Sequence, residues 1–196
     1  MTEPGHADPE VVTTVPMMLA VGAVLVLVMS AVYGFFGQVW GRSAFDGVRL
    51  PGGWAGAFAV FLASLLVHER LKQFVWKRRS ALPWSAFTVH PTMRRFGWAL
   101  EPAVPMRAAD YRAGLVWPVV VLSVAPVVAA FATGKGVALL WGELLMFESC
   151  SDLFRLVALA SVPGDAWIMA LSGRSGFRLV SDAEVAESAS ESRPIH

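Results

Sequence analysis

Long uncharged stretches divide the chain into segments that are apolar enough to cross a membrane. Charged side chains are absent from three of these stretches, residues 11–41, 50–67 and 113–134. A spanning helix needs about 20 predominantly apolar residues. We therefore predict three spanning helices, over residues 15–36, 54–76 and 113–133.

A fourth apolar region has a different pattern, because acidic side chains interrupt it. It covers residues 137–162 and contains Glu143, Glu148 and Asp152. It is still long enough to span, and we predict a fourth membrane helix here. After it, residues 165–171 are predicted to form a short helix at the surface.

The two ends of the chain have little apolar surface to bury. Residues 1–14 are predicted to form an N-terminal tail. Residues 181–196 are rich in Ser, Ala and Glu, which is typical of a disordered tail. The remaining residues, 15–180, form one membrane domain. The fold class that follows is an all-α polytopic membrane protein with about four spans.

The connection between the second and third predicted spans is too long for a turn and is rich in basic residues. Residues 85–90 and 96–100 are short aromatic and β-branched runs around PTMRR, a pattern typical of a β-hairpin. The stretch from Arg70 to Arg112, both included, contains nine Lys or Arg side chains, against two in the loop before the second span. Basic residues in short loops mark the cytoplasmic side. We therefore predict a multi-pass protein of the cell inner membrane, with this hairpin insertion and both termini in the cytoplasm.

Composition agrees with a membrane location and excludes several classes of protein. Of the 196 residues, 56% are apolar and 16% are charged, whereas soluble domains have about 45–50% and roughly 25%. The single cysteine, Cys150, excludes an intramolecular disulfide and a zinc site built from several cysteines. The basic run at residues 77–79 is explained by the cytoplasmic position of this loop, and it has no interleaved aromatic residues. Nucleic acid is therefore not an expected partner, whereas the lipid bilayer is.

Two groups of polar residues interrupt the predicted spans at helical spacing. His68 and Lys72 are four residues apart at the end of the second span and share a helix face with Glu69 beside them. Glu148 and Asp152 are also four apart, on the fourth span. Charged groups inside a membrane face a cavity or one another. We therefore expect the two groups to meet at one depth.

The stretch VHERLK, at residues 67–72, begins like the zinc-binding helix of a metallopeptidase. In the pattern H-E-x-x-H, two histidines at i and i+4 bind zinc from one face of a helix, and the glutamate activates the metal-bound water. Here His68 and Glu69 match the first two positions, but Lys72 stands where the second histidine would be. A protonated lysine has no lone pair to donate, and its charge repels Zn²⁺.

The order of motifs resembles a family of bacterial membrane zincin peptidases related to the site-2 proteases. The parallels are LLVHERLKQFVW at residues 65–76, PMRAADYRAG at 105–114, VAP at 124–126, ESCSDLF at 148–154 and SGFRLVSD at 175–182. The resemblance implies a membrane domain with a β-containing segment between spans and a short C-terminal strand. It implies that His68 and Asp152 are zinc ligands and that Glu69 is the catalytic base. The departure at Lys72 puts metal binding in question.

Three hypotheses follow for the function. In the first, the protein is a catalytically degenerate pseudo-protease without a cofactor, in which Lys72 pairs with Asp152 in place of the metal. Such a protein would bind a membrane protein or a peptide. In the second, it is an active zinc protease in which Glu148 substitutes for the missing ligand beside His68 and Asp152. In the third, its intramembrane carboxylates handle protons or cations, or the protein is a scaffold.

Overall fold

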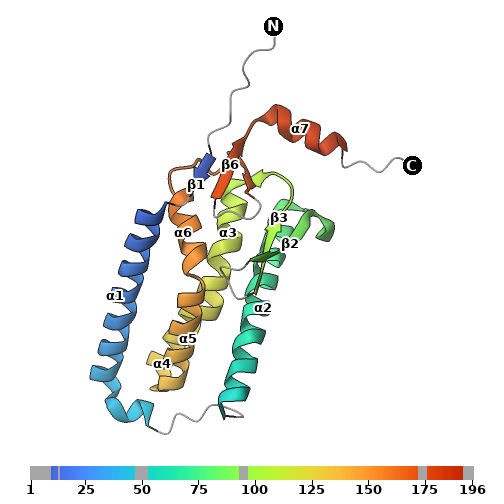
Figure 1. Cartoon of the computed structure of the whole chain (residues 1–196). Coiled ribbons are helices and arrows are strands. Elements are labelled where there is room, and N and C mark those ends of the chain that lie inside the picture. The colour runs from blue at the N-terminus through green and yellow to red at the C-terminus, as the bar shows by residue number, and fades with distance from the viewer. Residues whose placement is uncertain (1–9, 13, 47–52, 93–96, 172–175, 192–196) are drawn as a thin grey trace.

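A bundle of helices carries a small β-sheet at one end (Figure 1). The computed structural model describes residues 10–12, 14–46, 53–92, 97–171 and 176–191. The main helices are α1 (Val15–Trp40), α2 (Gly53–Ser80), α3 (Ala108–Pro118), α4 (Ala125–Thr133), α5 (Gly136–Glu148), α6 (Cys150–Leu159) and α7 (Asp182–Glu191). Short 3-10 turns, η1 (Arg42–Phe45) and η2 (Trp84–Ala86), follow the first two helices.

The third predicted span is part of one continuous helix that runs through the middle of the bundle. Helix α3 continues into the π-helical segment η3 (Val119–Val124) and then into α4, so that the helix covers Ala108–Thr133. Pro118 and Pro126 lack the N–H that an α-helical hydrogen bond needs, and the wider π-helical turns lie between them. α3 packs along α2, whereas η3 and α4 pack along α5.

Two helices among the described residues are long and apolar enough to cross a membrane, judged by length and composition. These are α1 and the continuous helix Ala108–Thr133. The other two predicted spans are also helical but differ from the prediction. α2 is longer than residues 54–76 and ends in the basic residues Lys77, Arg78 and Arg79. Residues 137–162 contain two shorter helices, α5 and α6, because Ser149 interrupts them. A count of four spans is therefore not confirmed.

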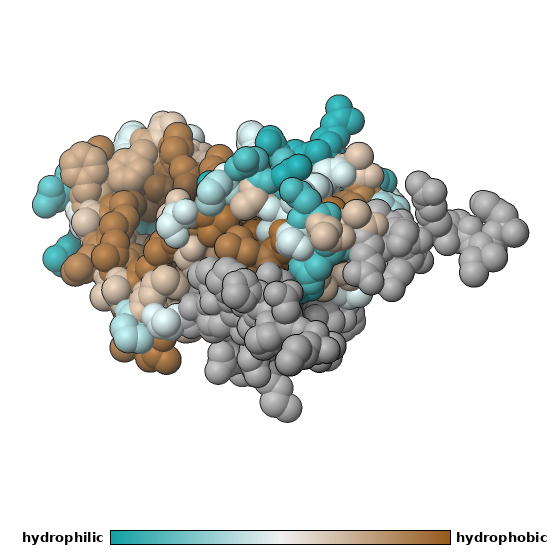
Figure 2. Space-filling view, turned by 90° about the horizontal axis from the view of Figure 1, so that it is seen from above, coloured by the Kyte–Doolittle hydropathy of each residue, from teal (hydrophilic) through white to brown (hydrophobic). Residues whose placement is uncertain are grey.

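The surface of α1 is almost entirely apolar. Only Leu25 and Phe36 are buried along its 26 residues, while Leu19, Leu27 and Phe35 are more than half exposed. Seen from the end that carries the sheet, hydrophobic residues gather on the side of the molecule where α1 lies (Figure 2). A contiguous apolar surface of this size indicates contact with lipid or with another protein.

The chain is mostly helical, as predicted, but besides the hairpin four short strands form an antiparallel sheet in the order β1-β6-β5-β4. The strands are β1 (Glu10–Val12), β4 (Met106–Arg107), β5 (Trp167–Ala170) and β6 (Gly176–Val180). The prediction of a surface helix over residues 165–171 is wrong. In β5, Ile168 and Ala170 are buried while Trp167 and Met169 are half-buried, which is the two-residue period of a strand.

The N-terminal and C-terminal segments are more ordered than the sequence predicts. β1 lies within the predicted N-terminal tail and pairs with β6, with Val11 opposite Phe177. The predicted C-terminal tail contains α7. Ser181 and Glu184 form a reciprocal capping box at its start, in which the N–H of Glu184 donates to Ser181 Oγ and the N–H of Ser181 donates to Glu184 Oε2, each at 3.4 Å. Residues 192–196 lie outside the described residues.

The predicted hairpin in the middle connection is confirmed. It is formed by β2 (Phe87–Thr92) and β3 (Gly97–Pro102), with His90 opposite Ala99. The residues between the strands, 93–96, lie outside the described residues. The hairpin follows the C-terminal end of α2 and precedes α3, so it lies beside the polar end of α2 (Figure 1).

The main hydrophobic core lies between the sheet and the adjoining ends of α2, α3 and α6. Trp76 is completely buried there, stacks on Tyr111 with 5.2 Å between ring centroids, and donates from Nε1 to the carbonyl of Tyr111. Gly114 makes this contact possible, because a Cβ at this position would stand 2.0 Å from Trp76 Nε1. The core therefore fixes α2 against α3 one turn beyond Lys72.

Candidate functional site

The first group of polar residues occupies one buried turn of α2. His68 and Lys72 are both 1% exposed, and Gln73 beside them is 4% exposed. Because His68 and Lys72 are four residues apart on a helix, their side chains point the same way, toward the junction of α5 and α6.

The second group lies at the junction of α5 and α6. Glu148 is the last residue of α5, Ser149 connects the helices, and Asp152 stands in the first turn of α6. Ser149 is buried and donates from Oγ to the carbonyl of Leu145 at 2.8 Å. A carboxylate is favoured in the first turn of a helix, where the backbone N–H groups point outward. Asp152 is fully buried in this position.

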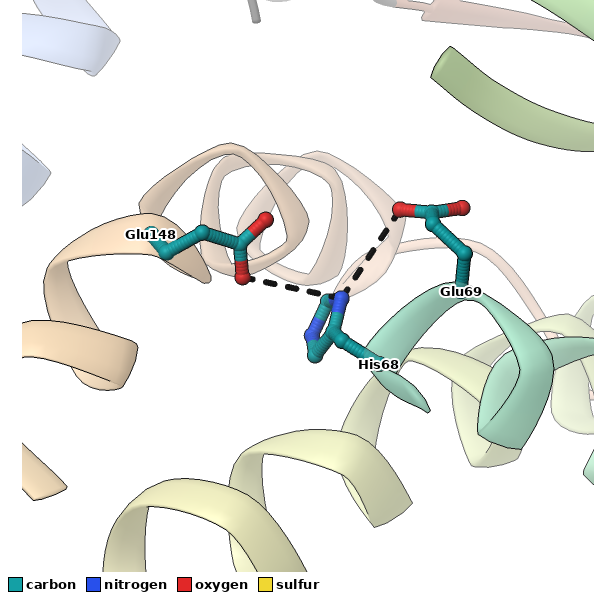
Figure 3. A group of neighbouring side chains, drawn as sticks. All are labelled: His68, Glu69 and Glu148. Carbon is teal, nitrogen blue, oxygen red and sulfur yellow. Dashed lines mark ion pairs between the residues drawn. The ribbon is translucent and has the colours of Figure 1, made fainter. Parts of the chain in front are cut away.

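The imidazole of His68 lies between carboxylates on both of its nitrogen-bearing edges. Nε2 is 3.5 Å from Asp152 Oδ2 and 3.3 Å from Ser149 Oγ. Nδ1 is 3.6 Å from Glu148 Oε2 and 3.7 Å from Glu69 Oε1 (Figure 3). His68, Glu69 and Glu148 each offer a ligand atom, and these three atoms lie within 4.8 Å of one another. The described residues thus contain a His-Glu-Glu cluster of the kind that can hold a metal ion.

Lys72 joins the two groups. Its Nζ is 2.6 Å from Glu69 Oε1 on the same helix and 3.3 Å from Asp152 Oδ2 on α6. The ammonium thus contacts two carboxylates in a site from which water is largely excluded, where charge-assisted hydrogen bonds are strong. A buried pair of this kind is costly to break, because removing one partner leaves a buried charge without compensation.

A second buried ion pair lies one turn further along α6. Arg155 Nη2 is 2.5 Å from Glu101 Oε1, and Arg155 Nη1 donates to the hydroxyl of Tyr111 at 3.5 Å. Glu101 belongs to β3, so the pair connects the hairpin to the helix that carries Asp152. Sequence reasoning missed Glu101 and Tyr111. The one available signal was a charged residue in the otherwise apolar run GWALEP, which does not reveal its partner.

The five residues of the two polar groups lie in one cluster: His68, Glu69, Lys72, Glu148 and Asp152. The arrangement does not fit the zinc site of an H-E-x-x-H peptidase. Lys72 stands at the second ligand position and Asp152 contacts its ammonium. A single-ion set of His68, Asp152 and Glu148 is also disfavoured, since Asp152 and Glu148 lie against different nitrogens of the ring.

Searches among protein-family models, curated proteins and solved structures find no match to this chain.

Proposed function

We propose that this protein is a multi-pass inner-membrane protein of the zincin type that lacks peptidase activity and acts by binding. The observation that carries the proposal is the position of the buried Lys72 ammonium, 2.6 Å from Glu69 and 3.3 Å from Asp152. In an H-E-x-x-H peptidase, a zinc ion would contact position 72 and activate water beside the glutamate. A positive charge at that position repels the ion and pairs with the glutamate that would act as base. Such a domain would bind a membrane protein or a peptide without cleaving it.

The membrane part of the proposal extends beyond the two helices that are apolar enough to span. α2 has 28 residues. α5 and α6 follow one another with only Ser149 between them, over residues 136–159. A helical segment of that length measures roughly 36 Å at 1.5 Å per residue, which exceeds a hydrocarbon core about 30 Å thick. We propose that these helices are the other two spans, and that their polar groups meet inside the bundle.

The proposed orientation has both termini in the cytoplasm. Arg79, near the basic end of α2, pairs with Asp110 at the start of α3 at 2.8 Å. The sheet that contains β1 and β6, the strands nearest the two ends of the chain, lies at the same end of the bundle (Figure 1). If the basic end of α2 is cytoplasmic, these two strands are cytoplasmic as well.

Zinc content tests the proposal directly. Purified protein in detergent is analysed for zinc by mass spectrometry, as wild type, Lys72→His, Asp152→Asn and the Lys72→His/Asp152→Asn double variant. We expect Lys72→His to gain zinc relative to wild type and the double variant to lose that gain. A zinc ion in the wild type that disappears in Asp152→Asn would overturn the proposal, because Asp152 would then be a ligand and not the partner of Lys72.

A further inference from the structure

The cluster has a second side that the Lys72–Asp152 pair does not use. We propose that His68, Glu69 and Glu148 bind one divalent transition-metal ion at the Nδ1 edge of the imidazole. This goes beyond the proposed function, because neither Lys72 nor Asp152 belongs to the ligand set. It is a binding site for a metal ion and not a peptidase centre, because Glu69 serves as a ligand and not as a base.

The three ligand atoms already lie close to the spacing that such an ion needs. Nδ1 is 3.6 Å from Glu148 Oε2 and 3.7 Å from Glu69 Oε1 (Figure 3). Around a tetrahedral zinc ion, with bonds of about 2.0–2.2 Å, ligand atoms lie roughly 3.3–3.6 Å apart. All three atoms lie within 4.8 Å of one another, so the two carboxylates would have to turn toward each other to close the set around an ion.

The state of His68 provides the independent observation that a ligand belongs here. The residue is 1% exposed, and its Nδ1 has no hydrogen-bond partner among the described residues. Its other nitrogen, Nε2, is held by Ser149 and Asp152 at 3.3 and 3.5 Å. In metal sites, the second nitrogen of a ligating histidine typically donates to a carboxylate or another oxygen, which leaves the first nitrogen's lone pair for the metal. The surroundings of His68 follow this pattern.

The charges of the cluster also favour a dication. The cluster contains three carboxylates (Glu69, Glu148 and Asp152) and one ammonium (Lys72). With a neutral imidazole, the formal charge of this buried group is therefore −2. One divalent ion would bring it to zero. Glu69 Oε1 also contacts Lys72 Nζ at 2.6 Å, so this oxygen would lie between the ammonium and the ion.

The site has an accessible edge on the side of the proposed ligands. The side chains of Glu69 and Glu148 are 15% and 17% exposed, whereas those of Lys72 and Asp152 are 1% and 0% exposed. The two carboxylates therefore form the outer edge of the cluster, and the imidazole is buried behind them. One nitrogen and two carboxylate ligands suit Zn²⁺ or Mn²⁺ better than Mg²⁺ or Ca²⁺, which prefer oxygen ligands alone.

Titration with Zn²⁺ tests the site in the full-length protein. Protein stripped with EDTA and returned to chelator-free detergent buffer is titrated with Zn²⁺, and bound zinc is measured after gel filtration. We expect close to one ion per chain for the wild type and at least a tenfold loss of affinity for Glu148→Gln. Glu143→Gln is the matched control, because Glu143 is a half-buried carboxylate on the same helix outside the ligand set. It should bind like the wild type.

Two further readouts keep the test decisive. The melting temperature in EDTA reports whether Glu148→Gln folds, and added Zn²⁺ should raise the melting temperature of the wild type but not that of the variant. X-ray absorption at the zinc edge of the wild type should show a single imidazole among oxygen ligands. The proposal is overturned if the wild type binds no Zn²⁺, if Glu148→Gln binds it equally well, or if the spectrum shows sulfur or no imidazole.

The two proposals fail separately. A larger loss of affinity in Glu148→Gln than in Asp152→Asn supports the His-Glu-Glu site, because Asp152 contacts only the second nitrogen of His68. Loss in Asp152→Asn with binding kept in Glu148→Gln would overturn both. Absence of any ion in the wild type would overturn this inference alone.

Discussion

The ammonium of Lys72 lies 3.3 Å from the carboxylate of Asp152, although 80 residues separate the two in the sequence. Both side chains are buried, and they join α2 to α6 across the bundle. The contact has the properties of an internal counterion: it compensates a carboxylate that sits at a helix start in a site with little water. Its energetic role can be measured directly.

Replacing Lys72 by Met should destabilise the protein strongly. Removing one partner of a buried ion pair costs about 3–5 kcal/mol, because the remaining charge is left without compensation. The double variant Lys72→Met/Asp152→Asn should recover part of this loss, since the uncompensated carboxylate is then neutral. Reversible unfolding in mixed detergent measures both. If Lys72→Met unfolds at the same denaturant concentration as the wild type, the pair has no structural role.

The Arg155–Glu101 pair should hold the hairpin against α6. Because both side chains are buried and 2.5 Å apart, we expect Arg155→Met to destabilise by about 3 kcal/mol or more. Limited proteolysis should then cut within residues 87–102. Arg79→Met is the control, because Arg79 is half exposed in its pair with Asp110. An exposed pair contributes about 0–1 kcal/mol, so equal effects of the two variants would contradict this role.

Adding a single methyl group at Gly114 should disturb the core. The new Cβ would stand 2.0 Å from Trp76 Nε1, so the indole or the helix must move. Overpacking of this kind costs about 1–3 kcal/mol. Gly22→Ala in α1 serves as the control, since no atom lies within 4 Å of its added Cβ. It should be neutral or stabilise by up to about 1 kcal/mol. Thermal unfolding followed by Trp fluorescence compares the two.

Fusion reporters test the orientation. Green fluorescent protein attached after the last residue should fluoresce in bacterial cells, because it folds only in the cytoplasm. Alkaline phosphatase fused after Asp46, in the first predicted external loop, should be active, because it needs the periplasm. An inactive phosphatase at Asp46 together with a dark C-terminal fusion would mean that the orientation is reversed. A negative result at only one of the two sites would place both sites on the same side of the membrane and would contradict an even number of spans.

The sequence predicts well what depends on local spacing. The helices follow from uncharged stretches, and the hairpin follows from two runs of strand-forming residues. The sequence also predicts the contact between the two polar groups. His68 and Lys72 share one helix face, and so do Glu148 and Asp152. The interruption at Ser149 was not predicted, although the residues around it, 148–152, are mostly polar.

The features that the sequence does not predict depend on distant partners. β1 has three residues and β5 has four, too few for a period-two pattern to be distinguished from a turn of helix. Their strand conformation comes from pairing with β6, which lies between them. Glu101 and Arg155 are 54 residues apart, and nothing in the neighbourhood of either indicates the other. The capping box at Ser181 and Glu184 has the S-x-x-E pattern, whereas the composition of the tail alone indicates disorder.

The sheet order ties distant parts of the chain into one unit. β6 pairs with β1 on one side and with β5 on the other, and Val11 of β1 stands opposite Phe177 of β6. Helices α1 to α6 all lie between these two strands in the sequence. The pairing of β1 with β6 therefore closes a loop that contains the whole helical bundle. A variant shortened before residue 176 would leave the edges of both β1 and β5 without this partner.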